Sequence, residues 1–273
     1  MTGEIQKHMG AAPLCTPQQM EGHRRASGFT LIELLVVIAI ISVLLALMVN
    51  GLTQARRVSQ RLACLSNLRQ LAIAWTDYLD ANDGYFLKGI NMNTNYGGKQ
   101  GSLRPFQKSK PLNMYVRLPD VVFEGAEVFK CPSDRGSRRV QPSYYDYMGT
   151  SYQMNPMLVG QSQVYVPSTD PCAELRGRIN KQLRMVNRSR AGNPSKLLLM
   201  GDYGWVAEWV AWSDDRIEWH FKEATHSVAF LDGHADFVRI EKGLHVTQNY
   251  NLYPFKGLET ELLACQKRPG DEK

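Results

Sequence analysis

The stretch that decides the fold is Gly28-Phe29-Thr30-Leu31-Ile32-Glu33-Leu34-Leu35-Val36-Val37-Ile38-Ala39-Ile40-Ile41, and the apolar run continues to Met48. The twenty residues from Phe29 to Met48 contain no Gly, no Pro and one charged side chain, Glu33. Twenty helical residues span roughly 30 Å, which is the hydrocarbon thickness of a bilayer. The sequence therefore predicts a transmembrane helix over residues 29–50. A carboxylate at the centre of such a helix costs about 2.5–3.5 kcal/mol, so Glu33 needs a partner, and the run itself offers none.

The residues before this run indicate its orientation. A secretory signal places its apolar region upstream of the cleavage site, whereas here the apolar region lies downstream of Gly28. The polar segment 1–28 carries His23-Arg24-Arg25 close to the run, and positive residues beside a membrane span stay in the cytoplasm. We therefore expect a single-pass protein with its N-terminus in the cytoplasm and everything after about residue 50 outside.

The same stretch resembles the processing site of type IV prepilins and type II secretion pseudopilins. The resemblance implies that a prepilin peptidase removes residues 1–28 by cutting after Gly28 and that Phe29 is N-methylated. It also implies that Glu33 pairs with the N-terminal amine of a neighbouring subunit and so sets the register of assembly. The expected partners are then the peptidase, the inner membrane and other pilin-like subunits, through the N-terminal helix. An ordinary signal anchor is the alternative.

A second helical pattern follows over residues 51–82. Apolar residues recur at spacings of three and four from Leu52 to Leu79, with Arg, Gln, Asn and Asp between them, which is typical of an amphipathic helix. Asn82-Asp83-Gly84 is a turn signal that ends the pattern. We expect one helix of about fifty residues, of which one half spans the membrane and the other supports a globular domain.

The rest of the chain predicts an extracytoplasmic head over residues 83–245 and a polar C-terminal tail over residues 246–273. A long loop with a short helix near Leu112–Leu118 comes first, and Lys196–Asp202 is typical of a buried strand. Asp232-Gly233 between two β-forming runs is a strong hairpin signal. The fold class is therefore α+β, and the resemblance implies a type IV pilin-like fold, with the long helix packed on a small antiparallel sheet with long loops.

Five cysteines are present, and Cys15 leaves with the leader. The other four allow up to two disulfides in an oxidising compartment, with three possible connectivities. Three motifs resemble a large pilin-like family found in multiple copies in some environmental bacteria: Cys64-Leu-Ser-Asn67-Leu-Arg-Gln-Leu71, Cys131-Pro-Ser-Asp134 and Phe230-Leu-Asp232-Gly233-His234. The joint recurrence of the two Cys motifs in that family implies a Cys64–Cys131 disulfide; buried free thiols are the alternative.

The late motif departs from that family. Its pattern has nine residues between a His and Asp-Gly, whereas here His220 precedes Asp232 by eleven intervening residues and His226 by five. Together with Asp202 and His234 these residues form a candidate metal cluster. Imidazole and carboxylate ligands suit zinc, whereas calcium prefers oxygen ligands, and some type II pseudopilins bind calcium in a C-terminal loop. The alternative is that Asp232 and His234 only stabilise the turn. Apart from this candidate metal, we expect no cofactor.

The remaining features bear on whether the protein binds sugars, binds nucleic acid or is an enzyme. Four tryptophans lie close together, and they belong either to core strands or to an exposed aromatic face that stacks on sugars: Trp205, Trp209, Trp212 and Trp219. The net charge of +6 is scattered, so we expect no nucleic-acid binding. Neither a Gly-x-Ser-x-Gly elbow nor a Gly-rich phosphate loop is present, so we do not expect an enzyme.

These observations favour a structural subunit, a pilin or pseudopilin, of a type II secretion or type IV pilus-like filament. It would lie in the bacterial inner membrane with a periplasmic head, and in a cell-surface filament after assembly. Two alternatives stay open. The first is a membrane-anchored surface protein that binds carbohydrate or a protein partner and uses the pilin start for export. The second is a metal-dependent enzyme on the same anchor.

Overall fold

The computed structural model describes residues 29–87, 93–103, 109–159, 172, 174–175, 177, 183, 186–210 and 217–266. The chain divides into two compact units, residues 1–50 and 51–273. The predicted leader, with Gly28, and Trp212 lie outside the described residues.

The long helix α1 (Leu31–Ala81) has 51 residues, as the sequence predicts. It begins after Thr30, whose hydroxyl accepts a hydrogen bond from the Glu33 N–H (3.3 Å), while the Glu33 carboxylate accepts one from the Thr30 N–H (2.9 Å). This reciprocal pair is a capping box. The helix ends at the predicted turn, where Gly84 adopts φ 77° and its N–H donates to the Leu79 carbonyl (2.7 Å). By length and composition α1 can span a membrane.

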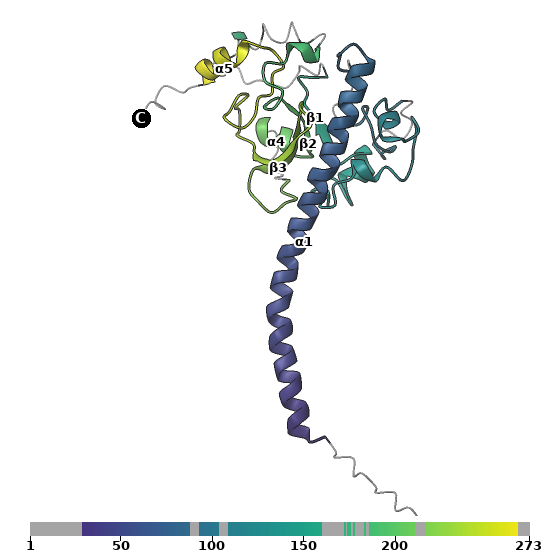
Figure 1. The fold of residues 1–273 in the computed structure, drawn as a ribbon, viewed down its shortest axis with the longest axis vertical. Helices are drawn as coiled ribbons and strands as arrows, with labels where there is room; N and C mark the ends of the chain where they lie inside the picture. The colour runs from purple at the N-terminus through teal and green to yellow at the C-terminus, as the bar shows by residue number, and fades with distance from the viewer. Residues whose placement is uncertain are drawn as a thin grey trace, which may run out of the picture. The chain divides into compact units, whose positions relative to one another are not determined.

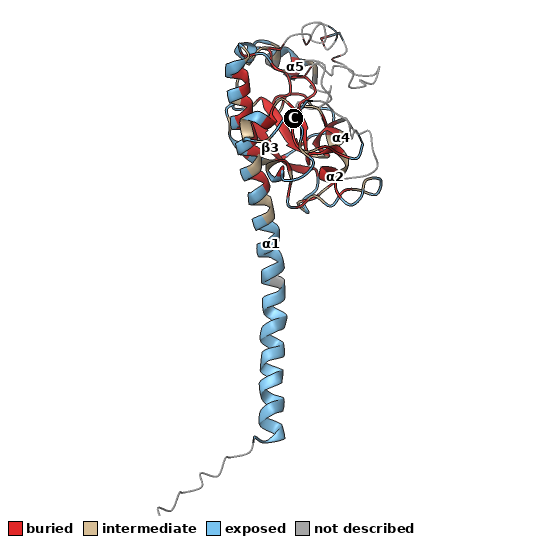
Figure 2. Cartoon of the chain, turned by 90° about the vertical axis from the view of Figure 1, so that its right-hand side faces the viewer, coloured by how far each residue is buried: buried red, intermediate tan, exposed pale blue. Residues whose placement is uncertain are grey.

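The exposure of α1 changes along its length (Figure 2). Every described side chain of residues 31–49 is exposed, although most of them are Leu, Ile or Val. Leu52 and Leu62, which belong to the predicted amphipathic pattern, are also exposed. From Cys64 onward one stripe is buried: Cys64, Leu65, Leu68, Leu71, Ala72, Trp75 and Leu79. The spacing of three and four places these residues on one face, which packs on the head.

The head contains a four-stranded antiparallel sheet in the order β1-β2-β3-β4. Figure 1 labels the first three of these strands. Its strands are β1 (Tyr152–Met154), β2 (Leu198–Asp202), β3 (Thr225–Phe230) and β4 (Ala235–Arg239). The predicted hairpin forms β3 and β4, with Gly233 at φ 95° in the turn. The strands β2 and β3 are buried along their whole length, so both faces of the sheet centre are covered. Arg69 of α1 donates to the Ala235 carbonyl (3.1 Å) and so ties the helix to β4.

Short helices complete the described head: η1 (Asn113–Val116), η2 (Glu127–Phe129), α2 (Tyr144–Met148), η3 (Arg188–Arg190), α4 (Trp205–Val210) and α5 (Leu258–Gln266). The predicted short helix near Leu112–Leu118 corresponds to η1. The interpretation of the Trp-rich segment as strands is wrong for residues 205–210, which form α4. Gly204 at φ 114° turns the chain directly after β2, and the four-residue spacing of Trp205 and Trp209 places both indoles on one buried helical face.

The prediction of a polar tail over residues 246–273 is wrong for residues 246–266. Six of their apolar side chains are buried in the core: Val246, Tyr250, Leu252, Tyr253, Phe255 and Leu262. The Asn251 carbonyl accepts from the Leu198 N–H (2.9 Å), and the Asn251 N–H donates to the Lys196 carbonyl (2.6 Å). This segment therefore runs beside the start of β2, because its closely spaced aromatic residues gain more from burial than its few charges lose. Residues 267–273 lie outside the described residues.

Candidate functional site

In the N-terminal motif, the Glu33 carboxylate finds hydrogen-bond donors within its own chain. The Glu33 carboxylate accepts hydrogen bonds from the Thr30 N–H (2.9 Å) and the Thr30 hydroxyl (2.7 Å), and Phe29 is exposed. The expectation that the apolar run offers Glu33 no partner is therefore wrong. The reason is local: Thr30 is the N-cap residue and Glu33 the third helical residue, the two positions of a capping box. A partner outside the chain would have to compete with this contact.

A second site lies inside the head, where α1 carries Cys64 on its buried stripe. One turn further, Asn67 donates to the Lys130 carbonyl (2.8 Å). This bond fixes the backbone directly before Cys131, which is buried beside Cys64. The spacing of Cys64 and Asn67 is thus explained, since both face the same segment from one face of the helix.

The rest of the Cys131-Pro132-Ser133-Asp134 motif holds this segment in place. The Asp134 carboxylate accepts from the backbone N–H groups of Tyr144 (3.0 Å) and Tyr145 (2.8 Å) at the start of α2. It also accepts from the Ser151 hydroxyl (2.7 Å), next to β1. Asp134 therefore joins the Cys131 segment to α2 and the sheet, which accounts for an acidic residue three positions after the cysteine.

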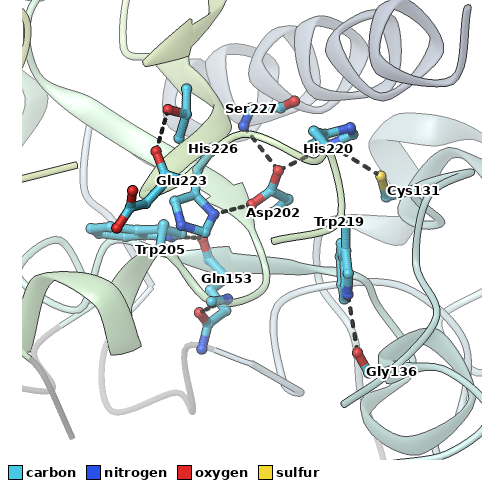
Figure 3. A network of polar contacts seen from close by, with 12 residues as sticks. Cys131, Gly136, Gln153, Asp202, Trp205, Trp219, His220, Glu223, His226 and Ser227 are labelled. Carbon is cyan, nitrogen blue, oxygen red and sulfur yellow. Dashed lines mark hydrogen bonds and ion pairs between the residues drawn. The ribbon is translucent and has the colours of Figure 1, made fainter. Parts of the chain in front are cut away.

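The centre of the site is Asp202, the last residue of β2 (Figure 3). One carboxylate oxygen contacts Nδ1 of His226 on β3 (2.6 Å). The other accepts from the Ser227 N–H (2.9 Å) and contacts Nε2 of His220 (3.2 Å). The antiparallel register pairs Gly201 with Val228, so the adjacent Asp202 faces the beginning of β3.

His220 connects this carboxylate to the cysteines. Its Nε2 lies 3.7 Å from the Cys131 sulfur (Figure 3), and the ligand atoms of Cys64, Cys131 and His220 all lie within 4.8 Å of one another. The His220 ring and the Phe237 ring of β4 pack edge to face, with centroids 5.6 Å apart. The four side chains come from α1, the loop after η2, the end of β2 and the segment before β3, and all four are buried.

The proximity of these groups shifts their pKa values in opposite directions. Burial raises the pKa of Asp202, but the electrostatic interaction with His226 and hydrogen bonds with His220 and His226 outweigh it and lower the pKa to about 2. Burial lowers the pKa of His220, but hydrogen bonds to Asp202 and Cys64 raise it to about 9. Burial raises the pKa of both thiols. Hydrogen bonds with Cys131 and His220 outweigh this effect at Cys64 and lower its pKa to about 7. At Cys131, the contact with Cys64 adds to the effect of burial, so the pKa of Cys131 stays well above its usual value.

Two kinds of chemistry use such groups. A cysteine beside a histidine that a carboxylate orients is the arrangement of an activated nucleophile. Here both sulfur atoms are buried in the core, so a substrate would not reach them in this conformation. Two sulfur atoms, an imidazole nitrogen and a carboxylate oxygen are also a donor set that suits zinc and does not suit calcium.

The predicted metal cluster divides into two parts. Asp202, His220 and His226 lie in this buried site. Asp232 and His234 instead pair with each other in the exposed β3–β4 turn, where His234 Nδ1 lies 2.5 Å from Asp232 Oδ1. His226 stands at the beginning of β3 and Asp232 beyond its end, and four strand residues alone span roughly 13 Å. The five candidates therefore do not form one site. Asp232 also accepts from the His234 N–H (3.1 Å), the contact expected of a turn residue.

The structure does not contain the predicted Cys64–Cys131 disulfide: both residues are buried thiols. The disulfide that it contains joins Cys172 to Cys265, 93 residues apart. Sequence reasoning brought Cys64 and Cys131 together but missed that His220 and Asp202 meet them. The available signal was the placement of Cys64 on an apolar helical stripe and of Asp202 at the end of a buried strand, since both face the core.

The tryptophans behave as core residues where the structure describes them. Trp205, Trp209 and Trp219 are buried. The Trp205 indole N–H donates to the Gln153 carbonyl (3.2 Å) and that of Trp219 to the Gly136 carbonyl (3.1 Å), as Figure 3 shows. These three side chains offer no exposed face for stacking on a sugar.

Comparison with known proteins identifies one region of the chain. A family model described as the prokaryotic N-terminal methylation motif matches residues 23–49. Searches of curated proteins and of solved structures found no match to this chain. The matched region contains Gly28, Phe29 and Glu33, and its apolar helix fits a single-pass membrane anchor. The match gives the chain a type IV pilin-like N-terminus of the kind found in pilin and pseudopilin precursors. Such a motif suggests a structural protein.

Proposed function

We propose that this protein is a structural subunit of a pilus-like or pseudopilus-like filament. The observation that carries the proposal is the methylation motif at residues 23–49, placed at the start of a helix whose apolar first half is exposed throughout. In this proposal a prepilin peptidase cuts after Gly28 and Phe29 becomes the methylated N-terminus. Residues 29–50 anchor the chain in the inner membrane, and the head lies in the periplasm.

The exposure of α1 supports assembly through this segment. Exposed apolar surface on this scale marks a membrane or protein interface. In a membrane, lipid covers single helices, and neighbouring helices replace lipid when their side chains pack well. A filament of side-by-side copies would bury the same side chains against one another.

During assembly, Glu33 would have to exchange the hydrogen bonds of the capping box for a contact with a neighbouring subunit. In the single chain, the carboxylate accepts two hydrogen bonds from Thr30. A neighbouring N-terminal amine would add a full positive charge, and a charge-assisted bond is about twice as strong as a neutral one. The proposal therefore requires the negative charge of Glu33 and not only its hydrogen-bonding oxygen.

Two substitutions separate these roles. Gln can fill the capping-box position as Glu does, so Glu33→Gln keeps the helix start but removes the charge, whereas Glu33→Val removes both. The full chain is produced in bacteria with a prepilin peptidase and a pilin-assembly system, and crosslinked multimers in membranes and sheared filaments are quantified. We expect both variants to be processed, and both to lose multimers by about tenfold or more, because a buried charge would lack its partner.

A matched control is Glu127→Gln in the head, which removes the same charge at an exposed position of η2. We expect it to assemble like the wild type. Assembly of Glu33→Gln at the wild-type level would show that Glu33 only caps the helix, and the proposed register role would be wrong.

A further inference from the structure

The buried cluster in the head has the composition of a metal site that differs from the one predicted from sequence. Cys64, Cys131, His220 and Asp202 supply two sulfur atoms, one imidazole nitrogen and one carboxylate oxygen, and each side chain is at most 2% exposed. Structural zinc sites bind the ion tetrahedrally with four such ligands and exclude water.

Three of the four donor atoms, those of Cys64, Cys131 and His220, lie close enough together to share one ion. Zinc lies about 2.3 Å from sulfur and about 2.0–2.2 Å from nitrogen and oxygen, so a tetrahedron has edges of about 3.4 Å between N and O, 3.6 Å between N and S and 3.8 Å between two sulfur atoms. His220 Nε2 lies 3.2 Å from Asp202 Oδ2 and 3.7 Å from the Cys131 sulfur. The ligand atoms of Cys64, Cys131 and His220 lie within 4.8 Å of one another, and the Asp202 carboxylate, which contacts this group at His220, would turn toward the sulfur atoms to become the fourth ligand.

The surroundings of Asp202 supply the outer contacts that metal ligands need. Its second carboxylate oxygen contacts His226 Nδ1 (2.6 Å), and the Ser227 N–H donates to the oxygen that faces His220 (2.9 Å). Such outer hydrogen bonds orient the ligands of a metal and are a regular part of metal sites. His226 is thus a positioning residue, and Asn67 has the same role for the Cys131 segment through the Lys130 carbonyl (2.8 Å).

The donor chemistry selects among the ions. Two thiolates favour zinc over calcium and magnesium, which take oxygen ligands. No donor faces solvent, and a closed site has no open position for a reacting water. We propose that Cys64, Cys131, His220 and Asp202 bind one Zn²⁺ ion that joins α1 to the loop after η2, to β2 and to the segment before β3.

The experiment measures metal in the full chain, purified in detergent with a tag that contains no histidine, without chelator or added reductant. We expect about one zinc per chain by elemental analysis. X-ray absorption at the zinc edge should give two sulfur neighbours near 2.3 Å and two nitrogen or oxygen neighbours near 2.0 Å. Zinc added back to chelator-stripped protein should raise the melting temperature, because an ion that binds only the folded state stabilises it.

Matched variants locate the site. Cys64→Ser and His220→Ala should lose the zinc, whereas the double variant Cys172→Ser/Cys265→Ser and His234→Ala should keep it. Where a site variant fails to fold, the absorption spectrum of the wild type decides, because it requires no substitution. A zinc shell without sulfur would overturn the proposal. So would a zinc-free wild type in which peptide mass spectrometry finds Cys64 bonded to Cys131, since an oxidising compartment favours that bond in the absence of a metal.

Discussion

The two halves of α1 form one continuous helix but bury their apolar residues in different ways. Residues 31–49 are almost entirely apolar, and all their described side chains are exposed, for example Leu31 at 81%. Residues 64–79 mix apolar and polar residues, and their apolar stripe is buried, with Trp75 at 0%. The comparison shows that one continuous helix can serve two environments, and that the described residues of this chain supply only the second of them.

The largest expected effect sharpens the comparison on the head side. The Trp75 ring packs against Tyr78, Phe86 and Tyr96, with centroids 5.4, 5.9 and 6.3 Å away. We expect Trp75→Ala to lower the free energy of unfolding of the head by about 3–5 kcal/mol, because it leaves a cavity in a packed core. Denaturant unfolding of the full chain in detergent, followed by circular dichroism, measures this loss.

Ile73→Ala is the control for that experiment, since Ile73 lies on the same helix but is 58% exposed. We expect a change within about 0.5 kcal/mol. Similar losses for both variants would mean that α1 does not pack on the head through the observed stripe.

The next effect concerns the first half of the helix. We expect Ile38→Asp to cost about 2.5–3.5 kcal/mol of membrane insertion, because a carboxylate in the middle of a span is poorly solvated. The fraction of chain that resists alkaline extraction from membranes should fall, while Ser66→Asp, at an exposed position of the second half, should leave it unchanged. Full membrane retention of Ile38→Asp would argue that residues 31–49 are covered by protein and not by lipid.

The smallest effect tests how the second half holds the Cys131 segment. Asn67→Ala removes one hydrogen bond, to the Lys130 carbonyl (2.8 Å), and we expect a loss of about 1 kcal/mol in unfolding free energy. Gln70→Ala is the control, because Gln70 is exposed and bonds only to Ser66 of its own helix in the described structure (3.4 Å). If Gln70→Ala costs as much as Asn67→Ala, the contact with the Lys130 carbonyl contributes nothing specific.

Local sequence patterns predicted the elements that depend on local physics. The length of α1 follows from the apolar run, the amphipathic spacing and the terminal Asn-Asp-Gly, and the β3–β4 hairpin follows from Asp232-Gly233. The capping box at Thr30 and Glu33 is equally local and could have been predicted, but no partner for Glu33 was expected within the run.

Features that depend on tertiary packing could not be read in this way. The Trp-rich segment alternates as a strand would, yet Gly204 permits the turn that starts α4. Residues 246–255 were predicted to be a tail because their aromatic residues have no regular period. The backbone they pair with lies at the start of β2, about fifty residues earlier in the chain, so no local pattern indicates the pairing. The meeting of Cys64, Cys131, Asp202 and His220 requires four segments to fold together, so no spacing along the chain encodes it.

The most direct test of the central claim is the intact mass of the chain isolated from bacterial membranes that contain a prepilin peptidase. The account predicts a chain that starts at Phe29, carries one added N-terminal methyl group and lacks residues 1–28. A chain that retains those residues, or that starts elsewhere without the methyl group, would contradict it.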